Sequence, residues 1–316
     1  MPWSIFVLTA LIRYYTLEND FKWGCSNEDC GELVGYVDDG AFSFGHKDPY
    51  FLSQVLSEKY NLLKKWMDAN KLVINPDKTH LMVLGPKKTV ALKQQVSIMA
   101  GDFKVVPSDT EKLLGGHIHH SLKWNYHLCE AKSSLLKQII SRNNALKRVC
   151  QNAKFKTKLM LANGAIHSKL VYLINIWGGA PQYLLKALQV QQLVAARTVC
   201  GYQSLRWSKY KLLKKTGWLS VRQLVQYYCI LQAHKTLRTG KPAVLHAALS
   251  SLYPYQTRSA SQGNIRLDRN ISVNSFTYRA MVSYNQVPSK VKEGSLLTVK
   301  RNLKKWIQHN TPLDYS

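Results

Sequence analysis

Two adjacent acidic residues, Asp38 and Asp39, separate two short apolar runs and complete the sequence Tyr-Val-Asp-Asp. Gly35 precedes this sequence and Gly40 follows it. Strand-forming residues on both sides of a short glycine-flanked segment predict a β-hairpin with the acids at its turn. Two carboxylates at one tip repel each other unless a cation lies between them, and Mg²⁺ prefers such hard oxygen ligands. The pattern is typical of a two-metal phosphoryl-transfer site, but it is also typical of an ordinary Asp-Gly turn.

The charge of the chain limits its partners. The formal net charge is +26, from 44 Lys+Arg against 18 Asp+Glu, which favours binding to a polyanion such as nucleic acid. A hydrophobic fraction of 46% indicates a folded protein rather than a basic disordered tail. Basic clusters interleaved with aromatic residues suit a long duplex or a single-strand track. The clusters are Lys64-Lys65, Lys87-Lys88, Lys147-Arg148, Lys154/Lys156/Lys158, Lys209/Lys211/Lys214/Lys215, Lys300-Arg301 and Lys304-Lys305, and the aromatics are Trp124, Tyr126, Phe155, Trp207, Tyr210 and Trp306.

Cysteine and histidine spacing gives little support for a structural metal. Cys25 and Cys30 are spaced C-x₄-C without a second pair at zinc-finger spacing, so zinc is disfavoured. Four histidines and one cysteine form a local cluster, which we expect to lie at a surface or interface and not to bind a metal. They are His117, His119, His120, His127 and Cys129. Without a secretory signal, we expect reduced thiols and a nuclear or cytoplasmic location. The apolar stretch 3–12 is too short to span a membrane, so we expect no membrane association.

A length of 316 residues suggests two domains or subdomains. Hydrophobic periodicity and turn residues predict the elements of the first part. They are a helix over 1–20, the hairpin over 31–45, a helix over 50–70, strands at 72–74 and 80–84 around the turn 75–77, a second hairpin over 96–106, and a strand over 113–120.

From about residue 125 the apolar spacing becomes helical. Glycine and proline then set the helix ends. We expect three helices that pack as a bundle, with apolar stripes over 128–149, 155–177 and 182–199, then a helix over 221–237, a polar loop at about 253–275, and a final helix over 296–309.

Further landmarks follow the hairpin in a distinctive order. An N-x₂-K-T run begins at Asn75, a Leu-Gly pair occupies 114–115, and an L-x-W-x₂-H run begins at Leu122. This order resembles the reverse transcriptase of non-LTR (LINE-like) retrotransposons. In that family the hairpin is motif C, the N-x₂-K-T run is motif D, and the Leu-Gly pair with the following L-x-W-x₂-H run is motif E. Looser matches extend the resemblance over most of the chain; they are Asn19-Asp20, Trp66, Asn70, Leu72, Met82-Val83, Leu188, Gln191, Arg197, Gly217-Trp218, Gly240-Lys241-Pro242, Asn285 and Pro288.

The resemblance implies an α+β chain in three parts. Residues 1–124 would be an incomplete polymerase palm, with the end of motif B and motifs C, D and E. Residues 125–200 would be an α-helical thumb bundle, and 201–316 a basic, mostly helical C-terminal region. The implied activity is RNA-directed DNA polymerisation with Mg²⁺ or Mn²⁺, on an RNA template and RNA–DNA hybrid, with dNTP if the chain is active.

The resemblance also implies residue roles. Asp38 would bind both metals and Asp39 would support the site. Lys78 would protonate the leaving pyrophosphate. Primer or nucleic-acid contacts would come from Tyr36, Gly115, Gly116, Lys137, Lys147 and Arg148.

Several features of the family are missing. The family places a third carboxylate on a strand upstream of motif B, and this chain has neither that strand nor the Gln-Gly pair that opens motif B. The fingers are absent, and His119 stands where the family often has Asp. We therefore expect no polymerisation by the chain alone, unless an upstream segment or a second chain supplies the acid. The alternatives are a non-catalytic RNA/DNA-binding remnant and a basic helical scaffold in which the hairpin is an ordinary turn.

Overall fold

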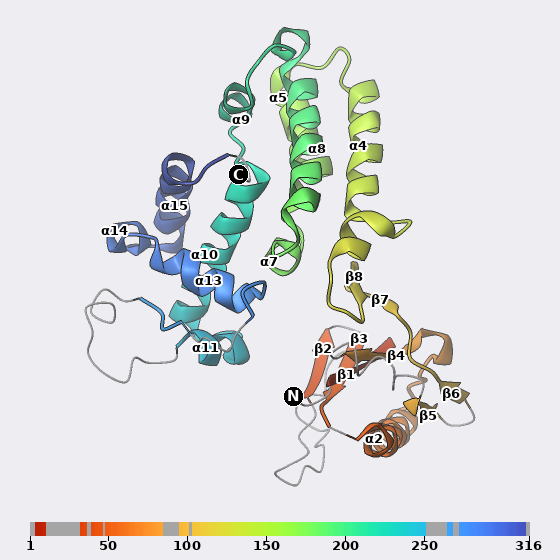
Figure 1. The fold of residues 1–316 in the computed structure, drawn as a ribbon. Helices are drawn as coiled ribbons and strands as arrows, with labels where there is room; N and C mark the ends of the chain where they lie inside the picture. Colours follow the sequence, from red (N-terminus) through yellow and green to blue (C-terminus); the bar gives the residue numbers. More distant parts are fainter. Residues whose placement is uncertain are drawn as a thin grey trace. The chain divides into compact units, whose positions relative to one another are not determined.

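The computed structural model of the chain is α+β and divides into two compact units, Met1–Tyr126 and His127–Ser316, each considered by itself (Figure 1). The structure describes residues 4–10, 32–36, 39–46, 48–84, 95–100, 103–250, 264–267 and 272–313. The sequence placed boundaries after 124 and after 200, and the division falls between Tyr126 and His127. The names palm, thumb and C-terminal region stay predictions.

The first unit is built on a four-stranded antiparallel sheet in the order β2-β3-β1-β4. The strands are β1 (Ser4–Ala10), β2 (Glu32–Tyr36), β3 (Asp39–Phe44) and β4 (Thr79–Leu84). The predicted hairpin is therefore present as β2 and β3.

The predicted helix over 1–20 is wrong where the structure describes it, because 4–10 form β1, which pairs with β3 on one side and β4 on the other. In a short apolar run, the periodicity of the sequence does not distinguish a buried helix from a buried strand. The backbone groups of β1 are satisfied by two neighbours, and this pairing depends on segments far away in the sequence.

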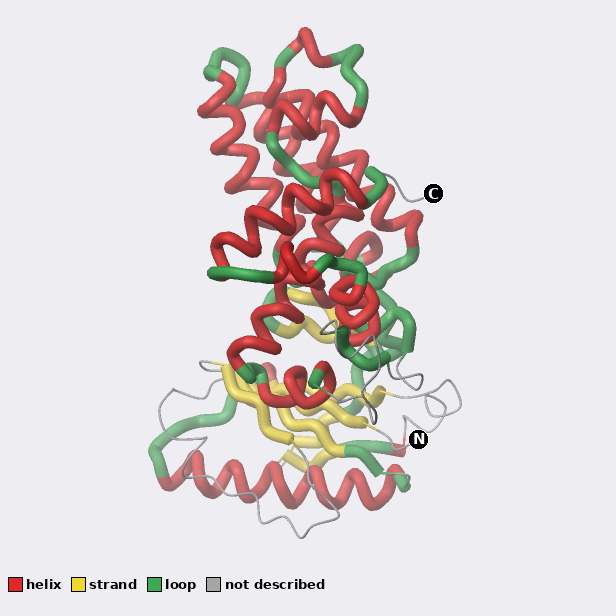
Figure 2. The backbone as a smooth tube through the Cα atoms, turned by 90° about the vertical axis from the view of Figure 1, so that its left-hand side faces the viewer, coloured by secondary structure: helices red, strands yellow, loops and turns green. Residues whose placement is uncertain are grey.

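Helix α2 (Pro49–Ala69) covers one face of this sheet (Figure 2). Asp48 caps it, since the side chain accepts a hydrogen bond from the backbone N–H of Tyr50 (2.8 Å), and Pro49 fits the first turn. The buried side chains of the helix recur every three or four residues, as the sequence predicted, and are Leu52, Leu56, Tyr60, Leu63 and Met67. They form one core with the sheet residues Phe42, Phe44, Leu81 and Val83 and with Val96 and Ile98.

Two small hairpins complete the first unit. The predicted one is β5 (Ile98–Ala100) with β6 (Phe103–Val105). The predicted single strand over 113–120 is instead a second hairpin, β7 (Thr110–Leu113) with β8 (Gly116–His119). The predicted strand 72–74 is also wrong, because these residues have no regular structure and lead into the 3₁₀ turn η1 (Pro76–Lys78).

In the second unit, α8 (Gln182–Cys200) contacts both α4 (Leu135–Val149) and α5 (Phe155–Ala162), the helices of the predicted bundle (Figure 1). The helix predicted over 155–177 is interrupted: after α5 come the π-turn η4 (Asn163–His167), α6 (Ser168–Val171) and α7 (Ile174–Trp177). The break falls at Leu173, whose φ of 55° is left-handed. Another π-turn of the same length, η3 (Tyr126–Glu130), precedes α4.

Helix α10 (Val221–Thr239) is central to the rest of the unit and contacts α13 (Phe276–Asn285) and α15 (Leu296–Asn310). Ser220 and Gln223 form a capping box at its start, and Gly240 (φ 68°) ends it. The predicted helices 221–237 and 296–309 are confirmed. The sequence did not single out η5 (Tyr202–Ser204), α9 (Lys209–Thr216), α11 (Ala243–Leu249), α13 and α14 (Ser289–Lys292).

Most of the predicted polar loop at 253–275 lies outside the described residues. Among the residues that are described, no helix has the length and apolar character needed to cross a membrane.

Candidate nucleic-acid interface

The Tyr-Val-Asp-Asp sequence forms the tip of the β2–β3 hairpin. Tyr36 pairs with Asp39 across the hairpin, so the connection is the two residues Val37-Asp38, which lie outside the described residues. Gly35 pairs with Gly40 immediately behind the tip. Asp39 is therefore the first residue of β3, next to the turn at which the sequence predicts both acids, and the location of Asp38 stays a prediction.

The Asn75-to-Thr79 turn holds its shape through Asn75. The Asn75 side-chain oxygen accepts a hydrogen bond from the backbone N–H of Asp77 (3.0 Å), and its carbonyl oxygen accepts from the N–H of Lys78 (3.2 Å) and the hydroxyl of Thr79 (3.0 Å). This is the geometry expected when an asparagine side chain mimics a backbone turn. Lys78 is exposed, whereas Thr79 is buried and begins β4.

The sheet register brings the hairpin tip and the Asn75–Thr79 turn to the same end of the strands, and this end is called the sheet edge below. Thr9 of β1 pairs with Gly40 on one side and with Thr79 on the other, so the start of β3 and the start of β4 flank the end of β1. Two strand spacings separate β3 from β4, which is about 10 Å. Helix α2 lies between the two segments in the sequence, so only the sheet reveals that they are neighbours.

Ala10 is the β1 residue at this edge that pairs with Asp39. The residue of the middle strand that faces Asp39 in the register is therefore alanine, which has no metal-binding or proton-transferring group.

Gly115 and Gly116 belong to the β7–β8 turn. Leu113 pairs with Gly116, which leaves Leu114 and Gly115 as the two loop residues, with φ of 47° and 80°. Positive φ at both central positions is the preferred geometry for a two-residue hairpin, and glycine adopts it without steric cost. Gly115 is exposed and Gly116 is buried, so the pair serves a turn within the fold, and a primer contact there stays a prediction.

Three histidines of the first unit, His117, His119 and His120, lie along β8 or directly after it. His117 stacks edge-on against Tyr126 at 5.7 Å, and burial, with a smaller effect from Lys112, lowers the pKa of His117. His119 and His120 have ring centres 4.3 Å apart. Within the described ranges, no three side chains of His, Cys, Asp or Glu come together as metal ligands would. Cys25 and Cys30 lie outside those ranges.

The three basic residues predicted to contact nucleic acid lie on α4. Lys147 and Arg148 are exposed in its last turn. The Lys137 ammonium group donates to the carbonyl oxygens of Glu130 and Ala131, both at 3.1 Å, and so ties α4 to the end of η3. Lys137 therefore has a structural role that its position in the sequence did not suggest.

Charge is divided unequally between the two units. In Met1–Tyr126, fourteen lysines and arginines face fourteen aspartates and glutamates, whereas His127–Ser316 has thirty against four. The whole net charge of +26 therefore belongs to the second unit. Residues 131–267 contain no aspartate or glutamate at all. Counting the charged residues in segments of the sequence finds this partition without a structure.

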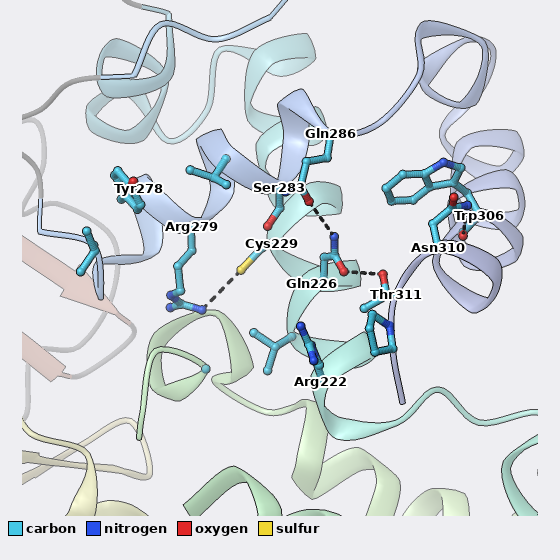
Figure 3. Close-up of a pocket in the computed structure, with 15 residues that line it drawn as sticks. Arg222, Gln226, Cys229, Tyr278, Arg279, Ser283, Gln286, Trp306, Asn310 and Thr311 are labelled. Atoms are coloured by element: carbon cyan, nitrogen blue, oxygen red, sulfur yellow. Dashed lines mark hydrogen bonds between the residues drawn. The ribbon is translucent and has the colours of Figure 1, made fainter. Parts of the chain in front are cut away.

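A cavity of about 670 Å³ lies among α10, α13 and α15 (Figure 3). Gln226 donates to the side-chain oxygen of Gln286 (3.3 Å) and accepts a hydrogen bond from the Thr311 hydroxyl. At its other side the Arg279 guanidinium donates to the Asn175 carbonyl oxygen (2.8 Å) and to the Cys229 sulfur (3.5 Å).

The polar groups that line this cavity stabilise the fold. Gly178 and Gly179 leave room for Arg279, because a Cβ on Gly178 would lie 3.0 Å from its Nη1 and one on Gly179 3.1 Å from its Nε. Burial raises the pKa of Cys229 to about 11, despite the opposing effect of Arg279, so this thiol is protonated at neutral pH and is a poor nucleophile.

Comparison of the chain with protein-family models, with curated proteins and with solved structures finds no significant match.

Proposed function

We propose that this chain is a fragment of a non-LTR (LINE-like) reverse transcriptase, in which the first unit is part of the palm and the second contains the thumb. The observation that supports this most is the shared sheet edge. Asp39 and the Asn75–Thr79 turn come from separate segments, and β1 joins them at one end of the sheet. Nucleotidyl transfer needs carboxylates and a proton donor close together, and this edge supplies both residue types.

The residues at this edge fit a divalent metal in part. Asp38 and Asp39 offer the carboxylate oxygens that Mg²⁺ and Mn²⁺ prefer, and they would hold the ion. When bound, it would activate a hydroxyl group and stabilise the leaving pyrophosphate. The exposed Lys78 would bring a proton and a positive charge to that pyrophosphate. Among the described residues, the one that pairs with Asp39 on the middle strand is Ala10, which offers no metal ligand.

The charge partition supports the second half of the proposal. A unit with thirty basic and four acidic residues has few internal partners for its cations, so it attracts the phosphates of nucleic acid. Phosphate contacts position a duplex without reading its sequence, which is what a polymerase thumb requires. We therefore propose that the isolated chain binds RNA–DNA hybrid but does not extend a primer. A non-catalytic binding protein is the second candidate, and Ala10 opposite Asp39 is the observation that favours it.

Two assays on the intact chain test the proposal. The first is primer extension on an RNA template with Mg²⁺ or Mn²⁺, with the wild-type chain and Asp38→Asn side by side. The second is fluorescence anisotropy with a labelled RNA–DNA hybrid over a series of salt concentrations. We expect no extension above the Asp38→Asn background, and hybrid binding that weakens by about a thousandfold between 50 and 200 mM salt.

The outcomes separate the candidates. Extension by the wild-type chain that Asp38→Asn abolishes would show that the fragment is a complete catalyst, which contradicts the proposed inactivity. Failure to bind the hybrid at low salt would contradict both candidates, because each assigns nucleic acid to the second unit.

A further inference from the structure

Helix α9 and the residues around it carry three lysine–aromatic pairs. The Lys211 ammonium lies 4.4 Å from the centre of the Trp207 ring, and Lys214 lies 5.7 Å from that of Tyr210. Lys215 lies 5.3 Å from the ring of Phe155, which begins α5 sixty residues earlier in the chain. We call these six residues the α9 face; they are Phe155, Trp207, Tyr210, Lys211, Lys214 and Lys215.

Helix α9 is amphipathic, and its buried side determines which of its residues face outward. Leu212, Leu213 and Thr216 are buried, and α9 contacts α8. Ser208 caps the helix by accepting a hydrogen bond from the N–H of Lys211 (3.3 Å), which sets where its exposed side begins. Tyr210 and Lys214 are four residues apart on α9, and residues at this spacing are neighbours on a helical surface. Trp207 precedes the capping residue Ser208, outside the helix.

Two rings of the α9 face, those of Tyr210 and Phe155, are exposed, and that of Trp207 is half-buried. Tyr210 is 58% exposed and Phe155 is 37% exposed, and the adjacent Tyr202 is 89% exposed. All charged residues between 131 and 267 are basic, so no acid from that stretch neutralises the lysines. Exposed aromatic rings beside lysine ammonium groups match a ligand that has both flat apolar faces and negative charge.

We propose that the α9 face binds single-stranded nucleic acid. Unpaired bases stack on Tyr210 and Trp207, and Lys211, Lys214 and Lys215 contact the neighbouring phosphates. A cation–π contact at an exposed site is weak, so a base displaces the ammonium from the ring, and the lysine remains within reach of the backbone. A duplex hides the faces of its bases, so the site distinguishes single strands from hybrid. The inference rests on the proposed function only in that the second unit binds nucleic acid.

Fluorescence anisotropy with the full chain tests the inference with three probes. They are an oligothymidylate of about 12 nucleotides, a strand of the same length and charge with abasic positions, and a blunt RNA–DNA hybrid. We expect Tyr210→Leu and Trp207→Leu each to weaken binding to oligothymidylate by at least about fivefold, because one stacked base is lost. Binding to the abasic strand and to the hybrid is expected to stay unchanged.

Matched variants separate stacking from folding and from charge. Tyr183→Leu removes a tyrosine of α8 that is 60% exposed, close to the exposure of Tyr210, and it should not change binding to oligothymidylate. Tyr210→Phe keeps the ring and should bind like the wild-type chain. Lys214→Ala should lower the slope of log affinity against log salt by about one, whereas Tyr210→Leu should leave that slope unchanged.

Each result decides between this inference and the proposed function. If Tyr210→Leu and Trp207→Leu bind oligothymidylate as tightly as wild type while hybrid binding persists, the inference is wrong and the proposed function stands. Ring-dependent binding of the single strand without hybrid binding supports the inference and removes the thumb-like role. Absence of binding to every probe contradicts both. Binding to anionic phospholipid vesicles but not to the single strand would assign the α9 face to a membrane and overturn the inference.

Discussion

Among single residues, Ala10 has the clearest chemical consequence at the sheet edge. It pairs with Asp39 and ends the strand that separates the hairpin from the Asn75–Thr79 turn. Directly paired residues in an antiparallel sheet are neighbours, so a carboxylate at position 10 would add oxygen ligands beside Asp39.

We predict that Ala10→Asp strengthens Mn²⁺ binding by at least about tenfold, because additional carboxylate ligands raise the affinity for hard cations. Electron paramagnetic resonance of free Mn²⁺ measures this in the intact chain. Ala10→Asn has nearly the same shape without the charge and should bind like the wild-type chain, as should Ala10→Asp combined with Asp38→Asn and Asp39→Asn. Equal Mn²⁺ affinity of Ala10→Asp and wild type would contradict a shared metal site at this edge.

Lys137 shows a limit of sequence reasoning for single residues. Lysine on an amphipathic helix is normally a solvent-exposed cation, and no residue pattern indicates that the Lys137 ammonium group would meet the carbonyl oxygens of Glu130, at the end of η3, and of Ala131 after it. The π-turn that presents these carbonyls has no distinctive residue pattern. Lys147 and Arg148, in the last turn of the same helix, are exposed.

At the scale of elements, the packing of α10 against α13 buries a titratable group. His234 of α10 is only 4% exposed and its ring stacks on that of Tyr284 in α13, with centres 6.4 Å apart. Burial lowers the pKa of His234, and the nearby charges of Arg238 and Lys292 lower it further. Within the described part of the chain, neither ring nitrogen of His234 has a hydrogen-bond partner. The neutral ring is therefore the form that the α10–α13 contact accepts.

We predict that this contact weakens in mild acid. The ordinary pKa of 6.5 applies to the unfolded chain, and the folded pKa is lower. Protons therefore bind the unfolded state first as the pH falls below 6.5, and stability is lost until the folded pKa is reached. Urea unfolding at pH 7.5 and pH 5.5 measures the difference in the free energy of unfolding. His234→Phe keeps an aromatic ring against Tyr284 and should lose less stability over this interval; an equal loss would assign the pH dependence to other groups.

At the scale of the whole molecule, the two units differ in charge and not only in fold. The first unit carries the acidic hairpin and has no net charge, and the second carries the entire excess of +26. Attraction of a polyanion therefore depends on the second unit. This separation is consistent with a chain in which one part holds a reacting centre and another holds the nucleic acid, and it holds equally for a binding protein without activity.

Two pairs of adjacent basic residues, one pair in each unit, test this partition of charge directly. Lys147 and Arg148 on α4 and Lys64 and Lys65 on α2 are all exposed residues on helices, one pair in each unit. Because each phosphate contact contributes about 0.9 to the slope of log affinity against log salt, replacing Lys147 and Arg148 by alanine should lower that slope by about one to two. The same replacement of Lys64 and Lys65 should leave it unchanged. An equal effect of both pairs on hybrid binding, measured by anisotropy, would show that the charge partition does not direct binding.

The sequence by itself determined the elements whose signals are local. The hairpin around Asp38 and Asp39, the helix capped by Asp48, and the helices ended by Gly201 and Gly240 follow from alternation, periodicity and glycine or proline breaks over short windows. The charge excess, which favours a polyanion as partner, is likewise a property of composition.

Only the tertiary structure decided what depends on distant segments. The apolar run ending at Ala10 became a strand because β3 and β4 satisfy its backbone on both sides, and that pairing alone places Asp39 beside the Asn75–Thr79 turn. In the same way, Phe155 meets Lys215 because α5 and α9 both pack against α8. A sequence pattern reports contacts between residues a few positions apart, whereas a site built from several strands or helices exists only after the chain has brought them together.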